Sequence, residues 1–150
     1  MSDYKLVSEF NTAAEQKCES RPTPFNKEEA TFLTKMMLDE LCEFMITIDP
    51  NYKQTMINLI NDSKNLKFNN ELNGIDLVAE QVDALVDSYY YSLNGCVKKG
   101  IDFSKVFLEV HNANMNKRDP VTGKFLKRED GKIIKPVGFS EPNIKNVLTE

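Results

Sequence analysis

The stretch GIDLVAEQVDALVDSYYYSLNGCVKK (74–99) decides the fold, because its pattern predicts one long helix. Apolar side chains at helical spacing form its main predicted packing face: Val82, Leu85, Val86, Tyr89 and Leu93. Polar residues gather on the predicted solvent side: Gln81, Ser88, Ser92 and Lys99. Three acids share a separate stripe with apolar groups on both sides: Glu80, Asp83 and Asp87. Such a stripe needs an explanation, because clustered carboxylates repel one another unless a cation neutralises them.

A second acidic pair lies in the predicted helix LTKMMLDELCEFMITI (33–48). Glu40 and Glu43 are three residues apart, and Glu40 borders an apolar stripe made of Leu33, Met37, Leu41, Phe44 and Ile48. Two helices with carboxylates beside their packing faces can build an oxygen-rich cage, which hard cations such as Mg²⁺ or Mn²⁺ prefer. The alternative is that these acids only solubilise two amphipathic helices, since acid pairs at this spacing are common.

The composition limits the classes of protein to consider. A chain of 150 residues predicts a single domain (1–150) that can bury a core. No apolar run approaches the roughly 20 residues of a membrane span, and the first residues carry no apolar signal core. The net charge of −4 argues against a broad nucleic-acid surface. Three cysteines without a CxxC motif predict reduced thiols and a cytoplasmic location.

Local signals predict an all-α bundle of about four to five helices. The expected segments are 2–17, 26–48, 51–62, 74–99 and 102–114. Asn26 is a plausible N-cap, and Asp49-Pro50 is a helix stop. The helical core is expected over about 1–116, followed by a basic arm over about 117–150. Within that arm, FLKREDGKII (125–134) predicts a small β-hairpin around Asp130-Gly131.

The most chemically suggestive polar residues outside the acids follow the last predicted helix. His111 is the only histidine, and a lone histidine on a helix is more often a structural hydrogen-bonding group than a catalyst. A phosphate-facing edge near the helix end could be formed by Asn112, Asn114, Lys117 and Arg118. The arm continues the positive charge through Lys124, Lys127, Arg128, Lys132 and Lys135. The alternative is a solvated helix end whose cations complement the dipole. No Walker loop, GxGxxG, zinc spacing or triad motif occurs.

Several motifs together resemble the all-α nucleoside triphosphate pyrophosphohydrolases of the MazG-like superfamily. The chain is most similar to a branch labelled phosphoribosyl-ATP pyrophosphohydrolase-like or Cof-like. The resemblance covers most of the chain from Phe10 onward. The motifs that carry it are DELCEF (39–44), VDALVDSYYYSLNG (82–95), KGID (99–102), VHNANMNK (110–117) and GKIIKP (131–136).

The resemblance implies metal-dependent cleavage of a nucleotide between its α and β phosphates. The implied ligands of Mg²⁺ or Mn²⁺ are Glu40, Glu43, Asp83 and Asp87, with Glu80 next. The choice between Glu80 and Asp83 stays open, because the superfamily commonly has Glu-x-x-Asp before an aliphatic-aromatic run, whereas Asp83 and Asp87 are four apart. A homodimer or a dimer of dimers is also implied, with the active site near the subunit interface.

The expected function is hydrolysis of (d)NTP to (d)NMP and pyrophosphate, in nucleotide-pool house-cleaning. Glu43 or Glu40 would take the proton of the attacking water. Lys117, with Lys132 or Lys135, would hold the outer phosphates, and Asn114 and His111 complete the expected substrate-binding set. Two alternatives stay open: a phosphatase or pyrophosphatase for another phosphorylated metabolite, and a catalytically silent helical binding module.

Overall fold

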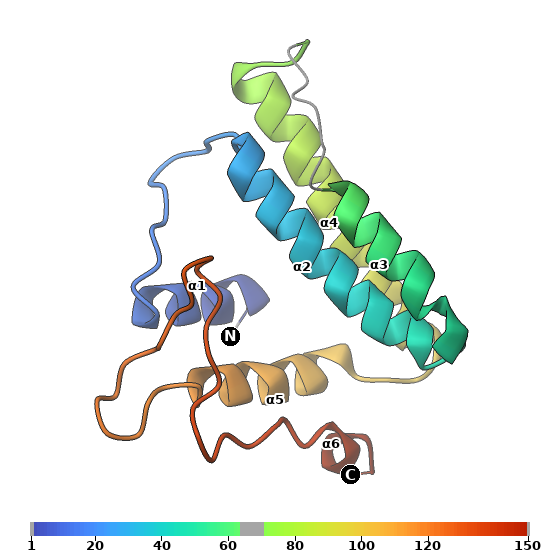
Figure 1. Cartoon of the computed structure of the whole chain (residues 1–150), viewed down its shortest axis with the longest axis vertical. Helices are drawn as coiled ribbons and strands as arrows, with labels where there is room; N and C mark the ends of the chain where they lie inside the picture. Colours follow the sequence, from blue (N-terminus) through green and yellow to red (C-terminus); the bar gives the residue numbers. More distant parts are fainter. Residues whose placement is uncertain (1, 64–70, 150) are drawn as a thin grey trace. The chain divides into compact units, whose positions relative to one another are not determined.

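The computed structural model describes residues 2–63 and 71–149, and its regular secondary structure is helical (Figure 1). In these residues the chain forms α1 (Asp3–Ala13), α2 (Lys27–Ile46), the 3₁₀ helix η1 (Pro50–Tyr52), α3 (Lys53–Asp62), α4 (Gly74–Lys98), α5 (Phe103–Met115) and α6 (Ile144–Thr149). The all-α class is confirmed. The short helix α6 was not predicted, and most of the predicted loop 63–73 lies outside the described residues. Nowhere in the described chain is a helix long and apolar enough to cross a membrane.

Contacts divide the chain into two compact units, and the boundary falls within α4. Unit 1 comprises Met1–Ser20 and Asp87–Glu150, and unit 2 comprises Arg21–Val86. Each unit therefore contains part of the long helix that the opening stretch predicts.

Unit 2 is built on the packing of α2 against α3. Helix α2 begins at the predicted N-cap, Asn26, which forms a capping box with Glu29. The Asn26 side chain accepts a hydrogen bond from the Glu29 N–H at 2.9 Å, and the Glu29 carboxylate accepts one from the Asn26 N–H at 2.9 Å. The helix ends at Ile46, before the predicted Asp49-Pro50 stop, where the Asp49 side chain accepts from the Asn51 N–H at 2.9 Å. Local signals in the sequence therefore set both ends of α2.

The buried side of α4 in unit 2 differs from the predicted one. Gln81, expected in solvent, is half-buried and exchanges two hydrogen bonds with the Phe25 backbone, at 2.9 Å from the Phe25 N–H and 3.3 Å to its carbonyl. Val78 is buried, whereas Val82 and Val86 of the predicted packing face are 47% and 57% exposed. The helix wheel misplaced Gln81 because its amide satisfies backbone groups that no apolar side chain could satisfy.

Unit 1 is built around α5, which packs against α1 and α6. Asp102 caps α5 by accepting from the backbone N–H groups of Ser104 and Lys105 at 3.1 and 3.3 Å. The N-terminus of α6 is held to α5, because the Glu109 carboxylate accepts a hydrogen bond from the Asn143 N–H at 2.8 Å. These polar contacts supplement a small buried core that contains Leu6, Ala14 and Ala113.

Before α6, the basic arm of unit 1 consists of turns rather than paired strands. It contains two isolated antiparallel bridges, Arg118 with Phe125 and Lys127 with Ile133, and no extended strand occurs within the described part of the arm. The second bridge surrounds the predicted turn, where Gly131 adopts a φ of 85°. The chain therefore reverses where the hairpin was expected, without the regular ladder of a hairpin.

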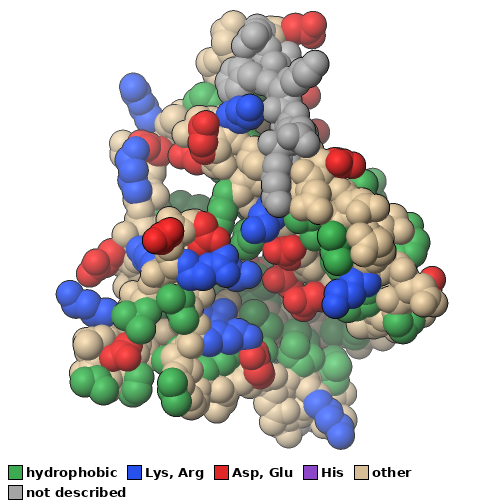
Figure 2. Space-filling model, in the orientation of Figure 1, with side chains coloured by type: hydrophobic (Ala, Val, Ile, Leu, Met, Phe, Trp, Pro, Cys, Tyr) green, Lys and Arg blue, Asp and Glu red, His purple; other side chains and the backbone are tan. Residues whose placement is uncertain are grey.

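Large apolar side chains remain on the surface of both units. Figure 2 shows hydrophobic side chains beside charged ones over the visible face. No large side chain is fully buried in the portion of the chain that the structure covers. Three residues of the predicted α2 stripe illustrate this exposure: Leu41 at 52%, Phe44 at 62% and Ile48 at 68%.

Candidate functional site

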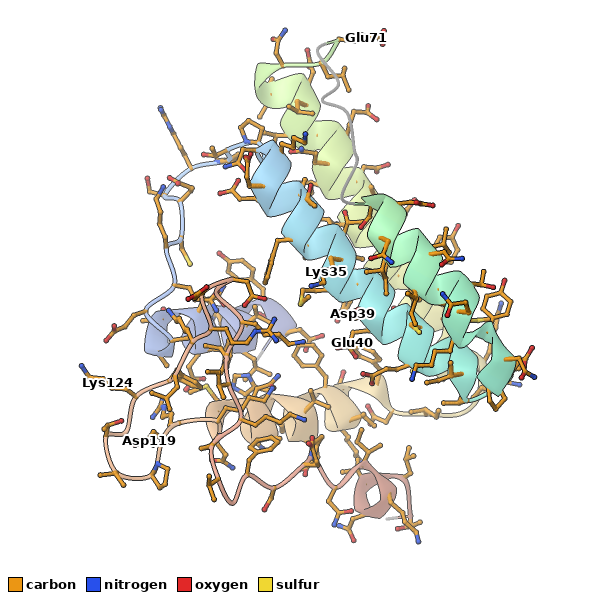
Figure 3. The ribbon with its side chains drawn as sticks, in the orientation of Figure 1. Lys35, Asp39, Glu40, Glu71, Asp119 and Lys124 are labelled. Atoms are coloured by element: carbon orange, nitrogen blue, oxygen red, sulfur yellow. The ribbon has the colours of Figure 1, made fainter. Side chains whose placement is uncertain are left out.

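The candidate carboxylates of α2 lie on a surface shared with apolar groups. Glu40 and Glu43 are about one helical turn apart and both are exposed. Figure 3 shows Glu40 beside Asp39 on α2. The exposed Leu41 and Phe44 occupy the same turns. The predicted juxtaposition of acids and apolar groups on this helix therefore exists, but at the surface of unit 2.

The candidate carboxylates of α4 have the same character. Glu80 and Asp83 are about one turn apart and exposed, and Asp87 follows one turn later in the unit 1 part of the helix. Val82 and Val86 are exposed on these turns. Because Glu80 and Asp83 are equally accessible, the choice of metal ligand between them stays open.

The candidate acids have no partner among the residues that the structure covers. Among the described residues, no salt bridge or side-chain hydrogen bond involves any of the five candidate acids: Glu40, Glu43, Glu80, Asp83 and Asp87. Several other acids have clear structural roles. Asp102 caps α5, and Asp119 holds a turn in which the Thr122 N–H, its main donor, lowers the pKa of the carboxyl. The unpartnered acids are therefore available to an external cation.

The carboxylates do not form a ready-made metal cluster. Within 2–63 and 71–149, no group of three His, Cys, Asp or Glu side chains is arranged to hold a metal ion. The donors nevertheless fit Mg²⁺ or Mn²⁺ chemically, because every one is a carboxylate oxygen. The structure supplies oxygen donors in pairs on two helices, and their assembly into a cage stays a prediction.

His111 occupies a packed position on α5. Its side chain is 7% exposed, and its Nε2 atom lies 3.8 Å from a carboxylate oxygen of Glu9 on α1. This environment joins two helices of unit 1. It supports the structural alternative for this histidine, and a role in substrate binding stays a prediction.

Two of the predicted substrate-binding lysines meet at one aromatic ring. The Nζ atoms of Lys117 and Lys135 lie 5.7 and 5.4 Å from the ring centroid of Phe139. Lys135 also forms an ion pair with Glu141. We call Lys117, Lys135 and Phe139 the Phe139 cluster. It brings together two cations that are far apart in sequence, and cation–π attraction holds each over the ring.

The other predicted substrate-binding residues are not part of this cluster in the described contacts. Asn114 is half-buried near the end of α5, and Lys132 is exposed in the turn where its N–H donates to Asp130 at 3.1 Å. The residue that sequence reasoning missed is Phe139. The only sequence signal for Phe139 is its position four residues after Lys135. This signal is weak, because the sequence does not show that Lys117 also lies near the ring.

The family comparison gives a specific match over most of the chain. Residues 7–114 match the family described as phosphoribosyl-ATP pyrophosphohydrolase. This span includes the candidate acids of α2 and α4 and ends at Asn114, before the basic arm.

A solved structure gives a match in fold. The crystal structure of a protein from Exiguobacterium sp. 255-15, provisionally named an NTP pyrophosphohydrolase, aligns with a TM-score of 0.76 and 23% sequence identity. The alignment covers 99% of this chain and 93% of that one, so the arm is included. At this level of identity the likeness establishes the fold alone. No curated protein matches the chain significantly.

Proposed function

Because the chain belongs to the phosphoribosyl-ATP pyrophosphohydrolase family, we propose that it is a Mg²⁺- or Mn²⁺-dependent nucleoside triphosphate pyrophosphohydrolase. It hydrolyses (d)NTP to (d)NMP and pyrophosphate, in the cytoplasm, as part of nucleotide-pool house-cleaning. The single observation that supports the metal dependence is the set of exposed carboxylates on α2 and α4 that have no partner among the described residues. Exposed carboxylates leave their oxygens accessible to a hard cation from solution.

The proposed metal ligands are the acids that the sequence singled out. Glu40 and Glu43 would supply oxygens from α2, and Glu80 or Asp83 from α4, with Asp87 on the following turn. When bound, the cation neutralises triphosphate charge and makes the α-phosphorus a better electrophile. The donors are hard oxygens throughout, which suits Mg²⁺ and Mn²⁺ rather than zinc.

The chemical step is attack of water on the α-phosphorus. The α–β phosphoanhydride bond breaks, a new P–O bond forms, and pyrophosphate leaves. Glu43 or Glu40 takes the proton of the attacking water. The base is the one of the two whose carboxylate oxygens are not all used to bind metal. Their exposure allows a water molecule to approach either carboxylate.

The Phe139 cluster is the proposed holder of the outer phosphates. Lys117 and Lys135 supply two ammonium groups whose positions are restrained by the same ring. An ammonium binds phosphate as a point charge, so the pair can follow a flexible polyphosphate chain. Lys132, Asn114 and His111 complete the proposed substrate-binding set.

The proposed assembly is a homodimer or a dimer of dimers. Its support is the exposure of large apolar side chains beside the acids: Leu41, Phe44 and Ile48 on α2, and Val82 and Val86 on α4. Contiguous exposed apolar groups rimmed by charges mark association surfaces. Packing against a second copy would also place the carboxylates in a drier environment, where a bound cation interacts with them more strongly.

The test is product analysis with a panel of dNTPs and NTPs in Mg²⁺ or Mn²⁺. We expect monophosphate and pyrophosphate, and loss of both in EDTA. Glu43→Gln and Asp83→Asn are expected to lower kcat by at least about a hundredfold, because each removes a metal ligand or base. Glu28→Gln and Asp76→Asn remove exposed acids from the first turns of the same helices and serve as matched controls.

The alternatives predict different products. Orthophosphate formed directly from a phosphorylated metabolite would favour the phosphatase alternative. If no nucleotide is hydrolysed or bound in the presence of Mg²⁺, the binding-module alternative or an unusual substrate is favoured. Full activity in folded Glu43→Gln and Asp83→Asn proteins would contradict the proposed site.

A further inference from the structure

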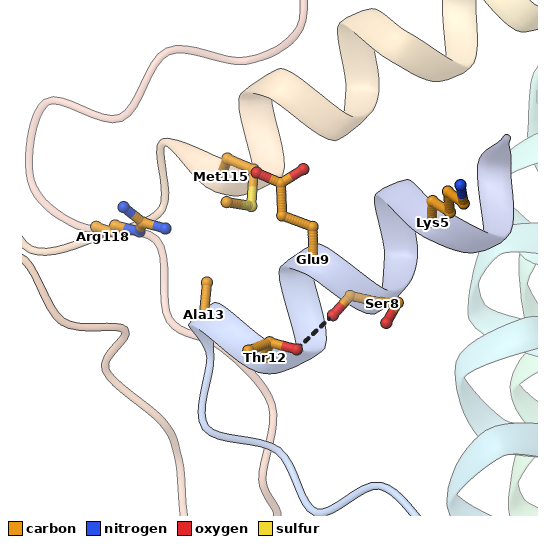
Figure 4. Close-up of a pocket in the computed structure, with 7 residues that line it drawn as sticks. All are labelled: Lys5, Ser8, Glu9, Thr12, Ala13, Met115 and Arg118. Atoms are coloured by element: carbon orange, nitrogen blue, oxygen red, sulfur yellow. Dashed lines mark hydrogen bonds between the residues drawn. The ribbon is translucent and has the colours of Figure 1, made fainter. Parts of the chain in front are cut away.

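A hollow of about 480 Å³ lies between α1 and the end of α5, within unit 1 (Figure 4). Lys5, Glu9 and Thr12 line it from α1, and Met115 and Arg118 line it from the end of α5 and the residues after it. Its size falls within the range of small-molecule sites. It shares no residue with the carboxylates of α2 and α4 or with the Phe139 cluster, and its one link to the proposed substrate-binding set is Glu9, which lies 3.8 Å from His111.

Arg118 is the best-oriented charged group in the hollow. Its guanidinium carbon lies 5.4 Å from the ring centroid of Phe125, with which Arg118 also forms a backbone bridge. The Phe125 ring packs edge-on against Phe10 of α1, with centroids 5.2 Å apart. The arm therefore fixes this guanidinium beside the hollow. A planar guanidinium with paired N–H donors is well suited to a phosphate group.

The hollow carries excess positive charge in an acidic protein. Its charged lining residues are Lys5, Arg118 and Glu9, whereas the chain as a whole has a net charge of −4. Lys5 lies one helical turn before Glu9, and Figure 4 shows Arg118 at the opposite end of the hollow, beside Ala13. Two cations with one carboxylate between them favour an anionic ligand over a cationic one.

The remaining polar side chains of the lining are Ser8, Glu9 and Thr12, and the last two act as acceptors. Glu9 presents a carboxylate, which cannot donate when ionised. The Thr12 hydroxyl donates to the Ser8 carbonyl at 2.9 Å, so towards the hollow it acts as an acceptor. Acceptors beside a guanidinium match a ligand that has hydroxyl donors next to a phosphate. Met115 and Ala13 add apolar surface that can contact the carbons between them.

We propose that this hollow binds a phosphorylated polyol, with its phosphate on Arg118 and its hydroxyls on Glu9 and Thr12. The ligand is either a free sugar phosphate or the sugar-phosphate portion of a nucleoside monophosphate. Lys5 adds attraction for the phosphate from the other end of the hollow. A bare phosphate ion is too small to contact Arg118 together with the apolar lining and the far acceptors, so it binds more weakly.

The experiment is an amide chemical-shift titration of the full chain with glucose 6-phosphate, AMP and inorganic phosphate, without metal. We expect glucose 6-phosphate or AMP to shift amides of 5–13 and 115–118, and inorganic phosphate to bind at least about tenfold more weakly. Arg118→Gln should weaken the sugar-phosphate ligand at least about tenfold. Lys105→Gln, which removes a cation from α5 outside the hollow, is the matched control and should leave the affinity unchanged.

A second variant protects the test from misfolding of the first. Ser8→Phe places a ring in the hollow from an exposed position of α1 and should also abolish the shifts. The proposal is overturned if saturating ligand moves no amide of the two segments, or if Arg118→Gln and Ser8→Phe bind as the parent does. It is equally overturned if Lys135→Gln, rather than Arg118→Gln, removes binding, because the ligand would then occupy the Phe139 cluster. Binding of glucose 6-phosphate without AMP identifies a free sugar phosphate, and the reverse identifies a nucleotide.

Discussion

At the scale of single residues, the acids of this chain fall into two kinds. Some make hydrogen bonds within the fold. Asp102 caps α5, and Glu109 of α5 accepts a hydrogen bond from the N–H of Asn143, just before α6. Others, including Glu43 and Asp83, have no partner in the described contacts. The sequence could identify the second kind from their helical spacing and apolar neighbours, because both are local properties. The sequence could not identify Phe139, because its role depends on contact with Lys117, which is distant from it in the sequence.

Tyr89 makes a residue-scale prediction about alkaline pH. Its hydroxyl donates to Asp3, and this hydrogen bond, with some burial, raises the pKa of Tyr89 from 10.0 to about 12. The folded pKa lies above the unfolded one, so the stabilisation is fully present below pH 10 and is lost as the pH rises through about 12. Tyr89→Phe should remove this part of the pH dependence. At neutral pH it should cost about 0.5 kcal/mol, because the pair is partly exposed.

The measurement is the free energy of unfolding in urea, followed from pH 8 to 11. Tyr90→Phe is the control, since Tyr90 is 66% exposed. Parallel pH profiles for the parent and Tyr89→Phe would contradict the assignment.

At the scale of elements, local chemistry set the helix boundaries. The Asn26 cap, the Asp49-Pro50 stop and the Asp102 cap are all observed. Helix faces were less predictable. Gln81 is drawn inward by the Phe25 backbone, although its spacing placed it among solvent-facing residues. A helix wheel records which residues share a side, whereas burial depends on what packs against that side.

The capping box of α2 gives the element-scale prediction. Asn26→Ala removes the acceptor for the Glu29 N–H and should destabilise the fold by about 1 kcal/mol. That loss corresponds to a Tm lower by about 2–4 °C for a chain of this size. Asn26→Asp keeps a good N-cap acceptor and should retain the parent Tm in a thermal unfolding scan at neutral pH. Equal destabilisation by both variants would show that the cap is not the cause.

At the scale of the whole molecule, many large apolar side chains are exposed to water, which is unfavourable in free energy. Phe44 and Ile48 expose 62% and 68% of their surface beside the candidate acids. The sequence predicted that these positions are packed, and in the described part of unit 2 they are exposed. Burial against a second copy satisfies both the pattern and the structure, because apolar area removed from water contributes roughly 25 cal/mol per Å².

The oligomer prediction follows from these exposed side chains. Phe44→Glu should convert the assembly to a 17.2 kDa monomer and lower activity, without loss of helical content. Tyr4→Glu introduces the same charge at another exposed aromatic position, on α1, and should leave the assembly intact. Light scattering coupled to size-exclusion chromatography measures the mass. An unchanged mass for Phe44→Glu would contradict this surface, and a monomeric parent would contradict the oligomer.

The sequence by itself determined the all-α class, the helix order and the stripes of acids on α2 and α4. Each follows from side-chain periodicity and from caps that act within a few residues. Tertiary structure decided that Gln81 faces inward, that the arm reverses through isolated bridges, and that Lys117 and Lys135 share the ring of Phe139. It also created the hollow beside Arg118. Apart from the arm bridges, which join residues close in sequence, these features join residues distant in the chain, and their energies come from contacts that no local pattern records.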